Sequence, residues 1–219
     1  MFTIAIDGPS GSGKTTCSIL TAQRLGCSYL DTGAMYRAVA VGCLEAGIDH
    51  DDQAGIVELC RDIDIDISTN PNERYIRLGD QDITQAIRTP AVSAWVSAVS
   101  TIAEARAILV DRQRAILASG SFVAEGRDIT TVVAPDAEVR VLLIADPDVR
   151  MARRGAELSG QLTAAALRDQ ILRRDRDDST LVNFTVAANG VVTIDSTLLT
   201  VEEVVDQIII LAQRAGIEV

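Results

Sequence analysis

Residues 8–15 read Gly-Pro-Ser-Gly-Ser-Gly-Lys-Thr and match G-x-x-x-x-G-K-[ST] at every fixed position. A strand-like apolar run ends at Asp7 directly before them, and an amphipathic helical pattern, KTTCSILTAQRL, follows. Glycines let the backbone of such a loop turn its N–H groups inward, and the helix start adds the positive end of its dipole. Because this arrangement binds phosphate groups, the segment predicts a site for a nucleoside triphosphate.

Lys14 is the single lysine, since every other residue among the 20 counted as Lys or Arg is an arginine. Arginine replaces lysine readily on a solvated surface, but its planar fork does not fit where a tight loop requires a compact point charge. We therefore expect Lys14 to reach the β- and γ-phosphates and the Thr15 hydroxyl to ligate Mg²⁺. The expected ATP-binding residues are Gly8, Pro9, Ser10, Gly11, Ser12, Gly13, Lys14, Thr15 and Thr16.

The charge balance narrows the partners of this site. Twenty basic against 31 acidic residues give a net charge of −11, and a field of this sign repels nucleic-acid backbones and anionic membranes. We therefore expect no polymeric nucleic acid and no membrane as partner, and a local cluster of positive charge wherever phosphate is bound. The cysteine spacing fits no zinc site, and without a leader-like or membrane-spanning run we expect reduced, packed thiols in a cytoplasmic protein.

Strand-sized apolar runs alternate with helix-sized segments. The runs lie at 2–7, 27–31, 121–126, 139–146 and 191–195. The alternation predicts an α/β fold, with a parallel sheet of the P-loop NTPase type covered by helices on both faces. One stretch differs, because acidic residues alternate with isoleucines over 62–68 and ERYIRL follows at 73–78. This stretch predicts a small antiparallel insertion with a charged outer face.

Two pairs of residues have the spacing of a helix capping box. They are Thr101 with Glu104 and Thr200 with Glu203. The first pair predicts that residues 89–118 form two consecutive helices instead of one. The second pair predicts a helix start near the end of the chain.

The lysine count also excludes one class of phosphate-loop protein. A regulatory GTPase needs a lysine in its guanine-reading motif, and this chain has no second lysine. A small kinase remains, and arginines that follow strand ends suit an acceptor that itself carries a phosphate. A kinase of another acceptor, such as a sugar or a shikimate-like acid, and an idle nucleotide-binding module stay open as alternatives. His50, the only histidine, lies in a polar loop and is expected at the surface without a catalytic role.

Further motifs occur in a fixed order along the chain: AIDGPSGSGKTT, YLDTGAMYRAVA, EGRDITTVV and RRDRDDST. In these motifs nearly the whole chain resembles the bacterial-type cytidylate kinases. The resemblance implies Mg²⁺-dependent transfer of the γ-phosphoryl group from ATP to CMP or dCMP by a monomer. It also implies one domain, 1–219, with a core (1–35, 119–146 and 190–219), a monophosphate-binding region that carries the insertion (36–118) and a helical lid (147–180).

The resemblance also assigns roles to individual residues. Lys14, Arg37 and Arg127 are implied to be catalytic, and Thr15 is the implied metal ligand. The implied CMP-binding residues are Thr32, Tyr36, Arg37, Ser97, Arg106, Arg127, Asp128, Arg174 and Asp178, and the implied lid arginines are Arg150, Arg153 and Arg154.

Within this set the two arginines Arg37 and Arg127 are expected on the acceptor phosphate, with Thr32 lining the same pocket. Ser97, Arg106 and Asp128 are expected to read cytosine, because a carboxylate suits its amino group while Arg and Ser donate to its acceptors. Arg174 and Asp178 resemble the pair that holds the pentose. At the strand ends near the loop, Asp7 and Asp31 either order Mg²⁺-bound water or cap a helix or turn.

Leu181 stands where the related sequences carry an arginine that reaches the pyrimidine. We expect a raised KM for CMP with kcat less affected, because the missing contact serves ground and transition states alike. Leu181→Arg is expected to improve kcat/KM for CMP about tenfold, worth ~1.4 kcal/mol, the size of one charge-assisted hydrogen bond. Steady-state kinetics check this, with Arg176→Ala as control. No gain from Leu181→Arg, together with a crippled Arg176→Ala, would show that Arg176 already fills the role.

Overall fold

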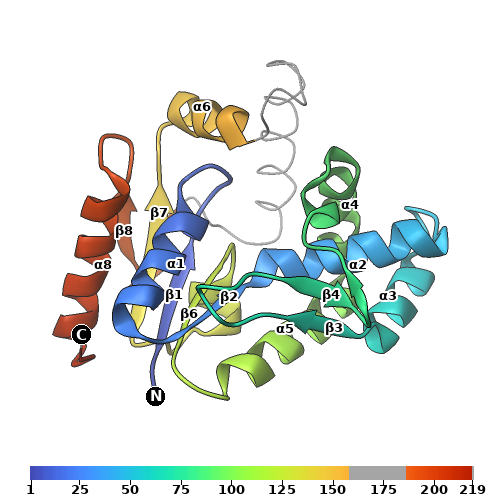
Figure 1. Cartoon of the computed structure of the whole chain (residues 1–219), viewed down its shortest axis with the longest axis horizontal. Coiled ribbons are helices and arrows are strands. Elements are labelled where there is room, and N and C mark those ends of the chain that lie inside the picture. The colour runs from blue at the N-terminus through green and yellow to red at the C-terminus, as the bar shows by residue number, and fades with distance from the viewer. Residues whose placement is uncertain (158–185, 219) are drawn as a thin grey trace.

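The computed structural model describes residues 1–157 and 186–218, and its larger sheet has five parallel strands in the order β2-β6-β1-β7-β8 (Figure 1). In chain order they are β1 (Thr3–Asp7), β2 (Ser28–Asp31), β6 (Phe122–Gly126), β7 (Val139–Ile144) and β8 (Val192–Asp195). Each follows a predicted apolar run to within two residues at either end. The parallel α/β prediction is therefore confirmed.

The helices of the described part are joined to these strands by short connections. They are α1 (Lys14–Leu25), α2 (Thr32–Ala46), α3 (Gln53–Asp62), α4 (Pro90–Thr101), α5 (Ala103–Leu117), α6 (Pro147–Glu157) and α8 (Val201–Arg214), with a 3₁₀ turn η1 (Ala86–Arg88) and a π-helical turn η2 (Ile129–Val133). The Thr200 hydroxyl accepts from the Glu203 amide while the Glu203 carboxylate accepts from the Thr200 amide. The predicted capping box at the start of α8 is confirmed.

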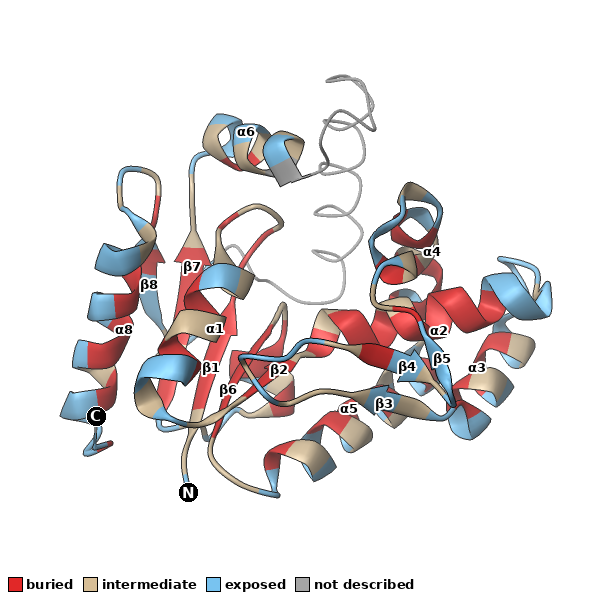
Figure 2. Ribbon diagram, viewed as in Figure 1, coloured by how far each residue is buried: buried red, intermediate tan, exposed pale blue. Residues whose placement is uncertain are grey.

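Both faces of the sheet are covered, as the buried colour of its central strands shows (Figure 2). Ile4 and Ile6 of β1 pack in one cluster with side chains of α1 and α8. Ala5, which points to the other face, packs with side chains of α2, α5 and η2. A strand buried on both sides reads as a continuous apolar run, which is why periodicity alone could not assign its faces.

The antiparallel insertion has three strands, β3 (Ile65–Ile67), β4 (Ile76–Leu78) and β5 (Gln81–Asp82), in that order. The predicted hairpin is confirmed, although a strand of two residues is too short to show an alternating pattern and β5 was missed. Ile76 and Ile83 are buried in a second core built mainly from α2, α3, α4 and α5. This core holds the insertion beside the edge strand β2, where the Tyr29 amide donates to the Thr69 carbonyl oxygen at 2.9 Å (Figure 1). It holds η1 beside the phosphate loop, because Ile87 and Arg88 line the same pocket as Lys14.

Residues 89–118 form two helices, but the reason predicted for the break is wrong. The α4 and α5 axes meet at 97°, and α5 begins after Ile102, which supplies no side-chain cap. Thr101 is the last residue of α4, so its backbone is helical and its hydroxyl donates to the Ser97 carbonyl oxygen at 2.8 Å. Glu104 instead pairs with Arg61 on α3.

In the described part of the chain no single helix has the length and apolar character to span a membrane. The α4–α5 pair, bent by 97°, meets the length and composition requirement only when the two helices are taken together.

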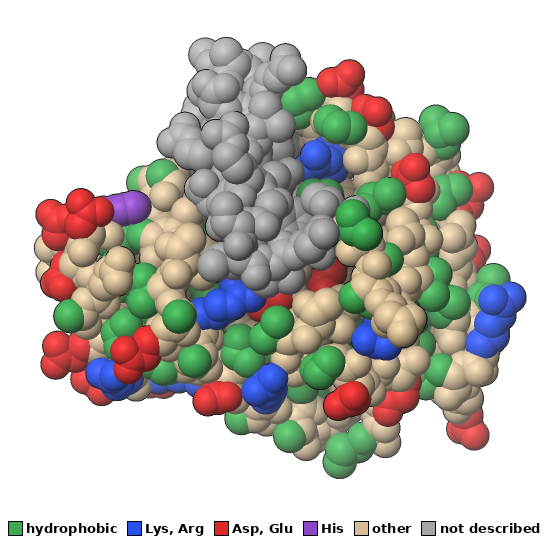
Figure 3. Space-filling view, turned by 180° about the vertical axis from the view of Figure 1, so that it is seen from behind, with side chains coloured by type: hydrophobic (Ala, Val, Ile, Leu, Met, Phe, Trp, Pro, Cys, Tyr) green, Lys and Arg blue, Asp and Glu red, His purple; other side chains and the backbone are tan. Residues whose placement is uncertain are grey.

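The cysteines and the histidine lie where the composition suggested. All four cysteines are free, and three are buried. Burial raises the pKa of the Cys17 thiol to about 11 and that of the Cys43 thiol to about 12, so both are protonated at neutral pH. His50 lies at the surface beside acidic side chains, visible at one edge of the molecule (Figure 3), and meets the edge of Trp95 at 4.9 Å between ring centroids.

Candidate active site

The loop between β1 and α1 adopts a backbone shape that favours glycine at three positions. Gly8, Gly11 and Gly13 have φ angles of 153°, 77° and 94°. A Cβ at Gly8 would lie 2.1 Å from the Leu143 carbonyl oxygen, and a Cβ at Gly11 would lie 2.6 Å from the Arg150 carbonyl oxygen. The loop backbone is therefore packed closely against β7 and α6, and both positions exclude a side chain.

The start of α1 favours a negative charge beside it. Its N-cap is Gly13, and within the described residues no side chain caps it. The first amides of a helix have no partners inside the helix, and the dipole adds positive potential there. Lys14 donates from Nζ to the Pro9 carbonyl oxygen at 2.9 Å, so its ammonium lies against the loop. Lys14, Thr15 and Thr16 line the pocket in front of the loop.

Three arginines from three separate elements line the same pocket: Arg37 of α2, Arg88 of η1 and Arg127 after β6. Arg37 is held from two sides, because it donates from Nη1 to the Ile87 carbonyl oxygen at 3.1 Å and to the Ser93 hydroxyl at 3.2 Å. The chain carries a net charge of −11, yet it gathers these three arginines in the pocket that Lys14 also lines. Sequence analysis missed Arg88, whose only signal is its place before the Thr89-Pro90 helix start.

Glu125 is a second residue that sequence analysis left out of the site. It is the last residue but one of β6, pairs with Ile6 of β1, is 4% exposed and lines the pocket. The Tyr29 hydroxyl donates to its Oε1 at 2.6 Å, and Thr15 hydrogen-bonds to the same carboxylate. Burial raises the pKa of Glu125 and the neighbouring Asp31 raises it further, whereas Lys14 and these two hydrogen bonds lower it. The signal was a carboxylate at the end of an apolar strand adjacent to the loop strand.

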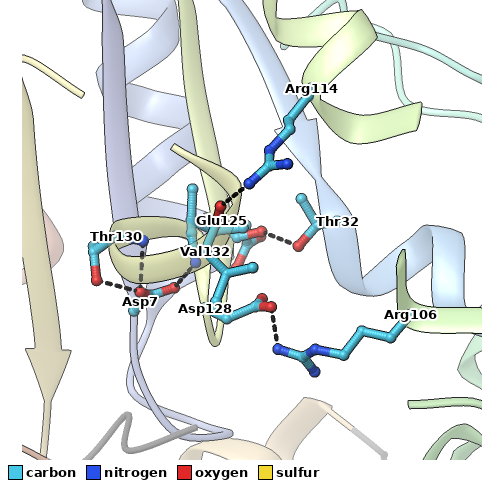
Figure 4. Close-up of polar contacts among 9 residues, drawn as sticks. Asp7, Thr32, Arg106, Arg114, Glu125, Asp128, Thr130 and Val132 are labelled. Carbon is cyan, nitrogen blue, oxygen red and sulfur yellow. Dashed lines mark hydrogen bonds and ion pairs between the residues drawn. The ribbon is translucent and has the colours of Figure 1, made fainter. Parts of the chain in front are cut away.

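The two aspartates considered for Mg²⁺-bound water both serve the fold. Asp31 accepts from the Ala34 amide at 3.0 Å and so caps α2, while it also borders the pocket. Asp7 accepts from the amides of Ile129 and Thr130, both at 2.8 Å, and from the Thr130 hydroxyl at 2.6 Å (Figure 4). Burial raises the pKa of Asp7, although these hydrogen bonds act in the opposite direction. Both side chains therefore cap a helix or turn, which is the second of the two roles expected for them.

Two of the three residues expected to read the base are brought together, and one of these, Asp128, directly follows Arg127 of the pocket. Arg106 of α5 forms an ion pair with Asp128, and both side chains are largely buried (Figure 4). Ser97 is half-buried on α4.

Two further residues expected to bind CMP, Thr32 and Tyr36, contact the protein itself. The Thr32 hydroxyl donates to the Glu125 carbonyl oxygen at 2.7 Å. Tyr36 is 7% exposed and packs in the core cluster of α2 to α5, so most of its surface is taken up by the fold.

Comparisons with known proteins identify the family of this chain. A sequence model described as cytidylate kinase matches residues 4–214. The chain belongs to the cytidylate kinase family. A cytidylate kinase from Cutibacterium acnes is 48% identical over 208 residues, which cover 94% of this chain and 93% of that protein. A cytidylate kinase from Geobacter sp. is 42% identical over 207 residues, covering 93% of this chain and 89% of that protein.

A solved structure shares the fold at low sequence identity. It is described as an uncharacterized protein from Eubacterium ventriosum, with a TM-score of 0.53 and 12% identity, and the match covers 97% of this chain and 98% of that one. The α/β architecture of this member of the cytidylate kinase family is therefore found in a protein of distant sequence.

Two of the expected lid arginines contact the phosphate loop and its surroundings in this cytidylate kinase family member. Arg150 donates from Nη1 to the Ser10 carbonyl oxygen at 3.1 Å, and its side chain is buried. Arg153 donates to the Ser196 hydroxyl at 3.0 Å and to the Ser196 carbonyl oxygen at 2.8 Å. Arg154 belongs to the same helix, α6. The expected residues Arg174 and Asp178, and with them Arg176 and Leu181, lie outside the described residues.

Proposed function

We propose that the protein transfers the γ-phosphoryl group of ATP to CMP or dCMP, giving ADP and CDP or dCDP. The observation that carries this is one pocket lined both by Lys14 with residues of the phosphate loop and by the three arginines Arg37, Arg88 and Arg127. A helix start with a lysine and a separate set of arginines in the same pocket suit two phosphorylated substrates. Membership in the cytidylate kinase family supports a cytidine monophosphate as the acceptor. The residues proposed for both substrates come from one chain, so a monomer is sufficient.

On the donor side the amides at the start of α1 bind the β-phosphate, and Lys14 exchanges the Pro9 carbonyl oxygen for phosphate oxygens. The hard oxygen donors Thr15 and Glu125 fit Mg²⁺, which in kinase sites takes one or two protein ligands and completes its shell with phosphates and water. Bound there, Mg²⁺ would neutralise phosphate charge. The hydrogen bond from Tyr29 holds the Glu125 carboxylate toward Thr15.

On the acceptor side Arg37, Arg88 and Arg127 neutralise the monophosphate and hold it in line with the γ-phosphoryl group. A phosphate oxygen of CMP is already a competent nucleophile, so the reaction needs no strong general base. Positioning and charge neutralisation supply most of the rate. Arg106 and Asp128, already paired, present one donor and one acceptor edge to the base. Arg174 and Asp178 are proposed for the pentose on the family resemblance alone.

A coupled assay of ADP release over a panel of acceptors tests the proposal. Turnover with CMP and dCMP, and little with AMP, GMP or shikimate, is the expected result. Turnover with shikimate or a sugar and none with CMP would favour the alternative of another small acceptor. Absence of turnover with every acceptor, in a protein that still binds ATP, would favour an idle nucleotide-binding module.

Asp128→Asn is expected to weaken CMP use and to narrow the preference for CMP over UMP. An amide donates to the uracil O4 that a carboxylate repels, and an unpaired contact of this kind costs on the order of 1–3 kcal/mol. The ratio of kcat/KM for CMP to that for UMP measures the effect. An unchanged ratio in a folded variant would remove Asp128 from base recognition.

A further inference from the structure

Asp7 sits at the end of the central strand, one residue before the phosphate loop. Strand alternation places its side chain on the same face as Ala5, toward η2, and not toward the pocket. The side chain is 3% exposed, and its carboxylate accepts from the amides of Ile129 and Thr130 and from the Thr130 hydroxyl (Figure 4). The ionised form of such a buried carboxylate makes strong hydrogen bonds with its three donors, and these bonds hold Ile129 and Thr130 in position.

The two amides that Asp7 binds are the first two amides of η2. The residue in the N-cap position of this turn is Asp128, with φ −143° and ψ 18°. Aspartate is among the strongest N-cap residues, because its side chain reaches the second or third amide of the turn. Nevertheless Asp128 makes no side-chain cap, and its carboxylate pairs with Arg106 instead. Asp7 of β1, which is far away in sequence, accepts from these amides in its place.

Two carbonyl groups of η2 are also held from outside the turn. Arg114 donates from Nη2 to the Val132 carbonyl oxygen at 2.7 Å and from Nε to the Val133 carbonyl oxygen at 3.3 Å (Figure 4). The amides of Val132 and Val133 close the turn on the Asp128 carbonyl oxygen at 2.8 Å and 3.1 Å. Because Arg127 and Asp128 directly precede this turn, its position sets where both side chains start.

We propose that Asp7 is a positioning residue for acceptor selectivity: by capping η2 from β1, it keeps the Asp128 carboxylate directed at Arg106 and the acceptor base. This inference rests on the proposed function. Without the Asp7 carboxylate, the buried amides of Ile129 and Thr130 lose their acceptor. The Asp128 carboxylate is the nearest acceptor in sequence that can replace it, and turning to cap η2 would take it away from Arg106.

Asp7→Asn is the direct test, because the amide keeps the size of the side chain and replaces one accepting oxygen with a donor. We expect KM for CMP to rise about tenfold, the ratio of kcat/KM for CMP to that for UMP to fall by a similar factor, and KM for ATP to change less than about twofold. Asp52→Asn is the matched control, since Asp52 caps α3 through the Gly55 amide at 2.9 Å on an exposed helix end. Loss of that cap is expected to leave the CMP:UMP ratio unchanged.

The same measurement in an Asp128→Asn background separates positioning from general damage. If Asp7 acts through the Asp128 carboxylate, Asp7→Asn changes the CMP:UMP ratio in the wild-type background and not in the Asp128→Asn background. Equal effects in both backgrounds would overturn the inference. Wild-type protein that does not phosphorylate CMP would instead refute the proposed function, so the two failures are distinguishable.

Thr130 provides a milder variant in case Asp7→Asn does not fold. Thr130→Val removes only the hydroxyl bond to Asp7 and keeps the amide bond, so the CMP:UMP ratio is expected to fall about threefold. Thr130→Ser restores a hydroxyl and is expected to restore the ratio. A folded Thr130→Val protein with an unchanged ratio, or a Thr130→Ser protein that loses selectivity equally, would overturn the role of this contact.

Discussion

Lys14→Arg is expected to lower kcat by roughly 10²- to 10³-fold, the range found when a charge-stabilising donor is removed from a transition state. Lys14 occupies the first position of α1 with its Nζ 2.9 Å from the Pro9 carbonyl oxygen, inside a loop pressed against β7 and α6. A guanidinium keeps the charge, but its planar fork is wider than an ammonium and cannot take the same place. Lys14→Ala is expected to lose at least as much activity.

Binding of CMP should survive both changes, because Arg37, Arg88 and Arg127 hold the acceptor. Release of ADP measures kcat, and the fluorescence of Trp95 follows CMP binding, since this sole tryptophan lies two residues before Ser97 on α4. The reciprocal control is Arg24→Lys at a half-exposed ion pair with Asp206, which is expected to leave turnover unchanged. Near-normal turnover of Lys14→Arg would mean that the single lysine reflects composition alone.

The parts of the site that residue spacing predicts most directly are those made by consecutive residues. The phosphate loop has a strand before it, glycines within it and a helix after it, and all three signals lie within a few residues of Lys14. The same holds for the Thr200–Glu203 box at the start of α8. Such spacing is a local signal, but it is not sufficient by itself, because Thr101 and Glu104 have the same spacing and form no capping box.

Arg88 and Glu125 escaped sequence analysis because each is brought to the pocket by tertiary packing. Arg88 arrives on a 3₁₀ turn of three residues that the α2–α5 core holds in place, and such a turn has no periodicity. Glu125 is the last residue but one of an otherwise apolar strand, where a carboxylate is also typical of the polar end of a strand. Which face of β6 it occupies depends on its pairing with β1 and β2, and two-sided burial removes the alternation that would have indicated it.

Glu125→Gln is expected to lower kcat about 100-fold while it makes the protein more stable at neutral and alkaline pH. The loss of activity follows from the role proposed for Glu125, which hydrogen-bonds with Thr15 in the pocket. A carboxylate there would supply negative charge to Mg²⁺, and an amide would not. Glutamine keeps the size of the side chain and can still accept from Tyr29, so the fold is retained. Residues that an active site requires often lower the stability of the folded protein, so replacing them raises stability while activity is lost.

The sign of the stability change follows from the raised pKa of Glu125, whose ordinary value is 4.5. Because the folded protein holds this proton to a higher pH than the unfolded chain does, ionisation of Glu125 disfavours folding. That penalty is absent below the ordinary pKa and is complete once the pH exceeds the raised one. Glutamine carries no charge to bury, so the gain in Tm should be largest at pH 8 and should shrink as the pH falls toward 4.5.

Thermal unfolding at several pH values, beside ADP release, measures both effects. Glu58→Gln is the matched control, because Glu58 is exposed on α3 and the same change of charge there is expected to leave both Tm and kcat nearly unchanged. Full activity of Glu125→Gln would exclude the carboxylate from Mg²⁺ binding. A Tm at pH 8 below that of the unaltered protein would show that the ionised Glu125 is stabilised by Lys14, Tyr29 and Thr15 more than burial penalises it, and that the site imposes no cost on the fold.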